Sequence, residues 1–262
     1  MSAPHLLPEI LDYIADLLHA KPETLKRCCL VSKSWIPRTR KHLFADIRFR
    51  TGKRLELWKE TFPDPLTSPA RYAKTLFIEC SHVVVAADVE PGGWITGFSR
   101  VVNLRVDSQA SFADGSFSFV PFHGLSPVLK SLRVTGPPPP SSQIINLVFS
   151  FPLLEDLAVF TSSKTPTDNG DSPNRLLTAI QPSSSPVFSG FLELHMKGGM
   201  GSFTRPLLSL PIGIHFRKLA LTWFQEADHL TTIALVERCS HALESLKITG
   251  LSRTSVQHTC LG

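Results

Sequence analysis

The sequence predicts an α/β fold in which three short N-terminal helices precede a stack of about seven parallel strands. The first reason is a phrase that returns along most of the chain: an apolar residue, two polar residues, leucine, one polar residue and an apolar residue. Its clearest copy is 129–134, with the sequence LKSLRV. The second reason is that apolar residues before residue 50 follow helical spacing, with prolines where helices can begin.

The repeated phrase has seven copies, each centred on one leucine. The copies are 73–78, 101–106, 129–134, 154–159, 191–196, 216–221 and 243–248, with inner leucines Leu76, Leu104, Leu132, Leu157, Leu194, Leu219 and Leu246. The steps between these leucines are 28, 28, 25, 37, 25 and 27 residues. This period and core are typical of leucine-rich repeats. Because one repeat cannot bury its apolar face alone, we expect the strands to stack into a curved solenoid.

The repeats also set the predicted boundaries. Residues 1–50 form the helical unit, 51–72 a connector with one short helix over 53–61, and 73–262 the solenoid. Helical spacing predicts crossover helices at 142–151 and 229–239. The 37-residue step points to a polar insertion at about 161–186. No capping signal follows residue 248, so we expect the edge of the last strand to be poorly covered and the chain to be a truncated form.

The N-terminal helices follow from proline positions and apolar spacing. Pro8 suits a first helical turn, and Pro22 opens a second helix that carries Leu25. Ser32 can cap a third helix, which carries Trp35 on its apolar side. The apolar face of the first helix comprises Ile10, Leu11, Ile14, Leu17 and Leu18. A unit this small is marginal alone and needs a partner or a neighbouring domain.

Composition excludes several classes of protein. Five cysteines without a C-x-x-C pair argue against a disulfide framework and a structural zinc site, and favour the reducing cytosol or nucleus. No apolar run is long enough to span a membrane, and the N-terminus does not resemble a signal peptide. The formal net charge of +5 is concentrated in residues 24–54, which hold ten Lys or Arg and one acid.

Catalytic and metal-binding motifs are absent from the sequence. The glycine-rich run 198–202 lacks the lysine of a phosphate-binding loop, and we expect a plain loop there after the strand at 191–196. No nucleophile elbow, zinc-protease helix or calcium loop occurs. We therefore expect a non-enzymatic protein with no catalytic residues, no cofactor and no metal.

The N-terminal residues carry a family resemblance. Leu7-Pro8-Glu9-Ile10-Leu11, then Leu25, then 30–35 (LVSKSW) resemble an F-box, and 25–49 is similar to the F-box proteins of mushroom-forming fungi, with repeats following. The resemblance covers about residues 6–49. It implies contact with a Skp-family adaptor, and through it a cullin, by Leu7, Pro8, Ile10, Leu11, Leu25, Leu30 and Val31, with Trp35 packed inside. The alternative is a helical cap that only closes the first repeat.

The basic segment 26–54 has two readings. Ten positive charges can hold nucleic-acid phosphates. However, its aromatic residues Trp35, Phe44 and Phe49 fall at positions where apolar spacing expects core. Skp-family adaptors are acidic by the same resemblance, so we favour protein docking over nucleic acid.

The repeats are expected to carry the second interaction surface. Strand residues flanking each inner leucine face the concave side, where solenoids bind partners. The predicted target-binding residues are Phe77, Arg105, Asp107, Arg133, Phe160, His195 and Lys247. Arg105 and Arg133 occupy one column of adjacent repeats, which His195 and Lys247 are expected to extend toward the C-terminus, and this column favours an acidic or phosphorylated target. Together with these repeats, the F-box resemblance implies a substrate receptor of a ubiquitin ligase, with a scaffold without ligase coupling as the alternative.

Overall fold

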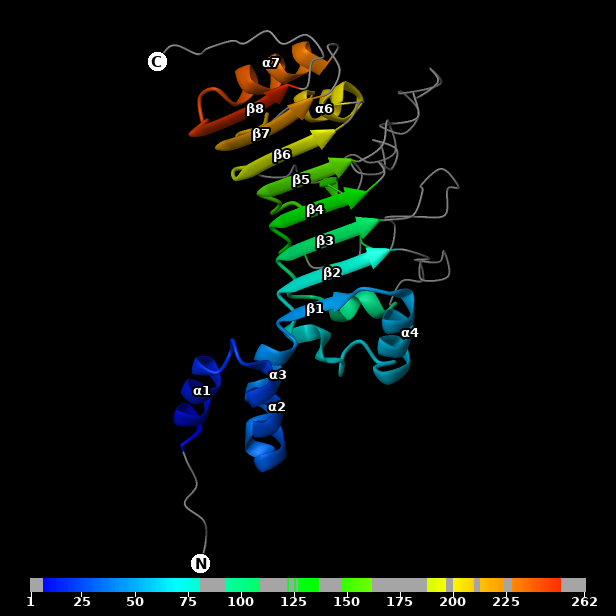
Figure 1. Ribbon diagram of the computed structural model, residues 1–262, viewed down its shortest axis with the longest axis vertical. Helices are drawn as coiled ribbons and strands as arrows, with labels where there is room; N and C mark the ends of the chain where they lie inside the picture. Colours follow the sequence, from blue (N-terminus) through cyan, green and yellow to red (C-terminus); the bar gives the residue numbers. More distant parts are fainter. Residues whose placement is uncertain are drawn as a thin grey trace, which may run out of the picture.

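The computed structural model describes residues 7–80, 93–108, 122, 125, 127–136, 148–161, 188–196, 200–209, 213–223 and 228–250. It is an α/β structure in which the eight strands of the described residues form one parallel sheet in the order of the sequence. The strands are β1 (Asp46–Phe49), β2 (Thr75–Cys80), β3 (Asn103–Ser108), β4 (Ser131–Gly136), β5 (Asp156–Thr161), β6 (Phe191–Met196), β7 (Lys218–Trp223) and β8 (Ser245–Gly250). Figure 1 shows them stacked along the long axis of the molecule.

Helices lie at both ends of this stack. The described ones are α1 (Pro8–Leu17), α2 (Pro22–Val31), η1 (Lys33–Trp35), α3 (Ile36–Leu43), α4 (Gly52–Thr61), η2 (Pro69–Tyr72), η4 (Trp94–Gly97), α6 (Met200–Leu208) and α7 (Asp228–Cys239). The first three α-helices gather beyond β1, whereas α6 and α7 lie near β8 (Figure 1). Among the described helices, none combines the length and the apolar character that crossing a bilayer demands.

Regular hydrogen bonds set the strand register. The carbonyl of Lys74 accepts from the backbone N–H groups of Val102 and Asn103, at 2.9 and 3.0 Å. The carbonyl of Val102 does the same for Lys130 and Ser131. As a result the inner leucines stand opposite one another, and Leu76, Leu104, Leu132 and Leu157 are each at most 1% exposed. The parallel arrangement that the repeated phrase predicts is confirmed.

The sheet begins earlier than the sequence predicts. Residues 46–49, inside the segment expected to be purely helical, form β1 and pair with β2 in parallel. Ile47 and Phe49 face inward and are 6% and 4% exposed, whereas Asp46 and Arg48 face outward. The strand is too short, and its charged residues too frequent, for alternation to be recognised before its pairing is known.

Aromatic side chains attach β1 and α4 to the first repeats. The ring of Phe49 meets those of Trp58 and Trp94 edge to face, with centroids 5.6 and 5.9 Å apart. Phe98, which is fully buried, lies 5.6 Å from Trp94. These packed rings, favoured in edge-to-face geometry, close the apolar core at its N-terminal end.

The register of β6 corrects one prediction. The sequence predicts Leu194 as the inner leucine, but Leu192 lies opposite both Leu157 and Leu219. The steps on its two sides are therefore 35 and 27 residues instead of 37 and 25. A two-residue shift leaves every side chain on its own face of the sheet, so the alternation of apolar residues cannot detect it.

The other predicted helices have mixed outcomes. The helices expected at Pro8, Pro22, 53–61 and 229–239 are confirmed as α1, α2, α4 and α7. The plain loop expected after β6 is wrong, because α6 begins there at Met200 and buries Phe203 and Leu207. Most of the helix expected at 142–151, and the insertion expected at about 161–186, lie outside the described residues.

The C-terminal end of the sheet differs from its interior. Leu246 and Ile248 of β8 point to the same side as the inner leucines, yet they are 44% and 46% exposed. The equivalent side chains of β7, Leu219 and Leu221, are each 1% exposed. Within the described residues nothing covers β8 as the next strand would, and 251–262 lie outside them.

Candidate interaction surfaces

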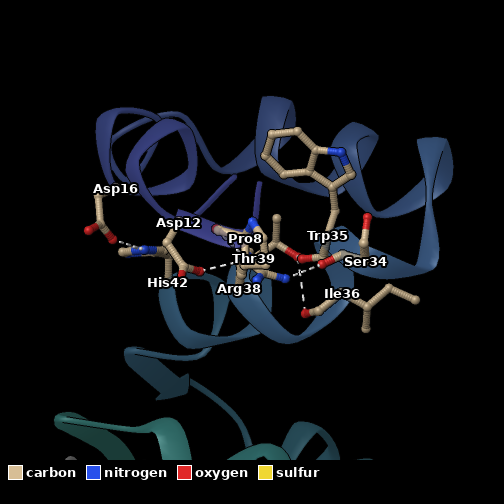
Figure 2. Close-up of polar contacts among 9 residues, drawn as sticks. All are labelled: Pro8, Asp12, Asp16, Ser34, Trp35, Ile36, Arg38, Thr39 and His42. Atoms are coloured by element: carbon tan, nitrogen blue, oxygen red, sulfur yellow. Dashed lines mark hydrogen bonds and ion pairs between the residues drawn. The ribbon is translucent and has the colours of Figure 1, made fainter. Parts of the chain in front are cut away.

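An ion pair and a histidine–carboxylate contact hold α1 against α3. The Arg38 guanidinium lies 2.7 Å from the Asp12 carboxylate, and Nε2 of His42 lies 2.8 Å from that of Asp16. Asp12 and Asp16 are four residues apart on α1, and Arg38 and His42 are four residues apart on α3. The two contacts therefore join the same face of α1 to the same face of α3, one helical turn apart (Figure 2). Arg38 also donates to the carbonyl of Pro8 at 3.3 Å. The position of the first turn of α1 therefore depends on α3.

A second set of contacts joins α2 to α3. The hydroxyl of Thr39, a fully buried residue, donates to the carbonyl of Trp35 at 2.8 Å. The Cys29 sulfur lies 2.8 Å from the same hydroxyl. Trp35, which is expected inside the unit, is half-buried. The three helices thus form a small unit with little apolar interior of its own.

The helical unit exposes most of the residues for which the sequence predicts an adaptor contact. Leu7 and Ile10 at the start of α1 are 63% and 43% exposed, and Leu30 and Val31 at the end of α2 are 87% and 77% exposed. Pro8 is exposed as well. We call these five residues the apolar helical patch. The two helices that carry them both pack against α3, and exposed side chains this apolar are candidates for contact with a partner.

Two residues of the predicted contact are placed elsewhere. Leu11 and Leu25 are only 6% and 1% exposed, so their side chains pack between the helices. This corrects the expectation that they line the contact directly, because a buried side chain can support a contact only from behind. Tyr13 and Leu17, which the sequence analysis does not assign to it, are 65% and 62% exposed on α1. Their four-residue spacing is the signal that marks them as neighbours.

Positive charge is exposed on α2, η1 and α3 of the helical unit. Arg27, Lys33, Arg40 and Lys41 are exposed and form no ion pair within the described residues. Lys26, by contrast, is paired with Glu23 at 2.6 Å. These four cations outnumber Glu9, which is also exposed and forms no ion pair within the described residues, and the resulting net positive charge favours an acidic partner and speeds its association.

The second surface is the face of the sheet opposite the leucine core, here called the open face. Arg105 lies over the ring of Phe77, with its guanidinium carbon 5.0 Å from the centroid. Arg133 lies over Phe160 at 4.3 Å. Phe77 belongs to β2 and Phe160 to β5, so the two adjacent arginines lean in opposite directions. This separation relieves the repulsion between like charges on neighbouring strands.

The remaining predicted target residues lie at different distances from this pair. His195 stacks on Phe160, with ring centroids 6.2 Å apart and planes inclined by 25°. The β6 register puts His195 opposite Phe160 and Thr222, and so it does not continue the arginine column as the sequence predicts. Lys247 is in that column, but Ala158, Glu193 and Ala220 separate it from Arg133.

The arginines of this column differ in how their charges are compensated. Arg48 makes two hydrogen bonds to Asp46, at 3.0 and 2.7 Å, and the pair raises the pKa of the guanidinium. Arg105 has only a loose contact with Asp107, at 3.9 Å. Arg133, on β4, is half-buried and has no acidic partner among the described residues. Its Nε is buried without a hydrogen-bond partner there.

The described residues contain no group of three or more histidines, cysteines and acids that could hold a metal ion. Burial raises the pKa of the Cys239 thiol, which keeps it protonated and a poor nucleophile. Comparisons with known protein families, curated proteins and solved structures give no match to this chain.

Proposed function

We propose that this chain is the substrate-recognition subunit of a Skp–cullin–F-box type ubiquitin ligase. The observation that carries the proposal is the apolar helical patch, five exposed residues from α1 and α2 at positions where an F-box contacts its adaptor. The exposed basic residues of the same helical unit favour an acidic partner, as Skp-family adaptors are. The sheet that follows is a leucine-rich-repeat solenoid in this proposal, and its open face holds the target.

The proposed mechanism is positioning. The helical unit binds the adaptor, the open face binds the target, and the sheet between them keeps the two contacts at a fixed separation. Holding a target near the ubiquitin-transfer machinery raises its effective concentration without any reaction in this chain. The role of the chain is therefore non-catalytic.

Adaptor capture tests the proposal. Leu30→Asp and Leu7→Asp each put a charge into an apolar contact, which should abolish co-purification with a Skp-family adaptor. Leu66→Asp is the matched control, because Leu66 is 84% exposed, close to the 87% of Leu30, but lies in the connector. All three variants should keep the thermal midpoint of the wild type, since each replaced side chain is exposed in the isolated chain.

The outcomes are distinct. Adaptor capture that survives in Leu30→Asp and Leu7→Asp would refute the docking role of the patch. A wild-type chain that binds targets but never the adaptor would instead identify a scaffold without ligase coupling. Loss of capture in Leu66→Asp as well would show that any added negative charge weakens an electrostatic association.

A further inference from the structure

Arg133 is the one guanidinium of the open face whose charge is left without compensation by the described residues. It is half-buried, no acidic group lies within 4.0 Å, and its buried Nε has no hydrogen-bond partner among them. Thr135, two residues along the same strand, has a buried hydroxyl oxygen that is likewise without a partner there. Unsatisfied groups of this kind are rare in folded proteins and call for an explanation.

The stack on Phe160 gives this guanidinium a defined orientation. Its carbon lies 4.3 Å from the ring centroid, so the flat group is supported on one side, and its N–H groups extend in its own plane. A guanidinium held in this way presents a two-pronged donor to a planar or tetrahedral oxyanion. Arg105 stands on the adjacent strand and is neutralised only loosely, at 3.9 Å from Asp107.

We propose that Arg133, assisted by Arg105, is the anion-binding centre of the open face and takes a carboxylate or phosphate group of an extended peptide. The strip from Phe77 on β2 to His195 on β6 crosses four strand intervals, roughly 19 Å, which an extended segment of about six residues spans. The proposed function enters only in the consequence of binding, which is that the bound peptide belongs to a target presented for ubiquitin transfer. The contact itself belongs to the open face alone.

The same geometry disfavours single-stranded nucleic acid. Bases need free aromatic faces on which to stack. The ring of Phe160 lies between Arg133 on β4 and His195 on β6, and the ring of Phe77 carries Arg105. The neighbouring acids Asp107 and Glu193 also interrupt the positive charge that a run of phosphates would follow.

Binding to degenerate peptide pools tests the inference. The pools share random flanks and differ only in a central phosphoserine, glutamate or serine, and the purified full chain is the receptor. We expect the phosphoserine or glutamate pool to be retained at least about tenfold more than the serine pool, as for charge-assisted hydrogen bonds. Whichever anionic pool binds better identifies phosphate or carboxylate as the source of the oxyanion.

Variants of Arg133 distinguish two-pronged hydrogen bonding by a guanidinium from binding through positive charge alone. In Arg133→Ala, retention of the preferred anionic pool should fall to that of the serine pool. Arg133→Lys should lose most of the preference for the anionic pool, because lysine keeps the charge without the planar guanidinium. Arg48→Ala is the matched control, since Arg48 stands in the same column but is engaged by Asp46. It should bind as the wild type does. The thermal midpoint of Arg133→Ala should not fall by more than a few degrees, because an uncompensated charge is removed.

Several results would overturn the inference. These are equal retention of the three pools, full binding by Arg133→Ala or Arg133→Lys, an equal loss in Arg48→Ala, or a single-stranded oligonucleotide that binds better than either anionic pool and depends on Arg133. Adaptor capture, measured on the same preparations, keeps the two proposals apart. Peptide binding without adaptor binding removes the ligase role alone, and adaptor binding without anion preference removes this inference alone.

Discussion

The carboxylate of Asp156, at the start of β5, accepts a hydrogen bond from the backbone N–H of Phe191, the first residue of β6, at 2.7 Å. At the start of β7, by comparison, the carbonyl of Gly190 accepts from both Arg217 and Lys218. A side chain has therefore taken the place of a backbone acceptor between β5 and β6. This bond supports the register in which Leu192, and not Leu194, is the inner leucine.

Removing this acceptor should weaken the join between β5 and β6. Asp156→Ala leaves the N–H of Phe191 without its charged partner, and we expect the free energy of unfolding to fall by about 1–3 kcal/mol. Asp156→Asn keeps an acceptor oxygen and should cost less. Urea unfolding at neutral pH measures both changes. Equal losses for alanine and asparagine would mean that the charge, and not the hydrogen bond, is what stabilises the pair.

Gly190 is tied to the same contact. A Cβ at this position would overlap the Oδ1 of Asp156 and crowd the carbonyl of Glu155 at 3.2 Å. Gly190→Ala should therefore destabilise the chain by about 1–3 kcal/mol, as overpacking does. In the Asp156→Ala background the cost should shrink, because the main obstacle is gone. Additive losses in this double-mutant cycle would contradict the assignment.

Arg38 should influence adaptor binding without touching the adaptor. Arg38→Ala removes the contacts to Asp12 and the Pro8 carbonyl. We expect the free energy of unfolding to fall by about 1–2 kcal/mol and the backbone amides of α1 to exchange faster. Adaptor affinity should fall as the first turn of α1 loosens. Arg40→Ala is the control for stability and amide exchange only, since Arg40 is on the same helix but exposed and without an ion pair among the described residues, whereas the loss of its charge can itself weaken binding to an acidic adaptor. Unchanged amide exchange in α1 of Arg38→Ala would argue that Arg38 does not hold the first turn of α1.

Asp228 should give the stability a distinct pH dependence. Burial raises the pKa of its carboxyl, although the backbone N–H of Gly201 opposes the shift, and its Oδ2 has no partner among the described residues. Below the ordinary aspartate pKa of about 3.9, the group is neutral in both the folded and the unfolded state. As the pH rises through the raised folded pKa, the unfolded chain has already released its proton, and folding stability is lost.

Asp228→Asn should therefore unfold at a higher temperature than the wild type at pH 7. The difference should disappear at about pH 3.5, where the aspartate is protonated. Thermal unfolding across this pH range measures the effect. A difference that stays constant with pH would point to packing or hydrogen bonding of the amide in place of the carboxyl charge.

Two leucines in equivalent positions of β7 and β8 should contribute differently to stability. Leu219 is 1% exposed and Leu246, opposite it on the next strand, is 44% exposed. Leu219→Ala should cost about 2–5 kcal/mol, whereas Leu246→Ala should cost only about 1 kcal/mol because less apolar surface returns to water. Chemical denaturation compares the two. Equal costs would show that a segment outside the described residues covers Leu246.

The sequence alone was sufficient for the features that depend on periodicity. The recurring phrase predicts parallel strands with buried leucines, and Pro8 and Pro22 mark the helices that present the apolar helical patch. Five of the seven predicted contact residues on those helices are exposed, and on the open face Arg105 and Arg133 are adjacent as predicted. Periodicity works here because it follows from the geometry of single elements.

The tertiary structure decided what depends on contacts between elements. It placed residues 46–49 in the sheet, because Ile47 and Phe49 have a core to enter. It also set the register of β6. Just before that strand, the ring of Phe188, buried with a positive φ of 43°, packs against that of Phe216 with centroids 5.0 Å apart and planes inclined by 44°. It buried Leu11 and Leu25, and it turned the two arginines apart onto Phe77 and Phe160. Alternation specifies which face of a sheet a side chain takes, but the neighbour that it meets there is chosen by hydrogen bonds and packing across strands.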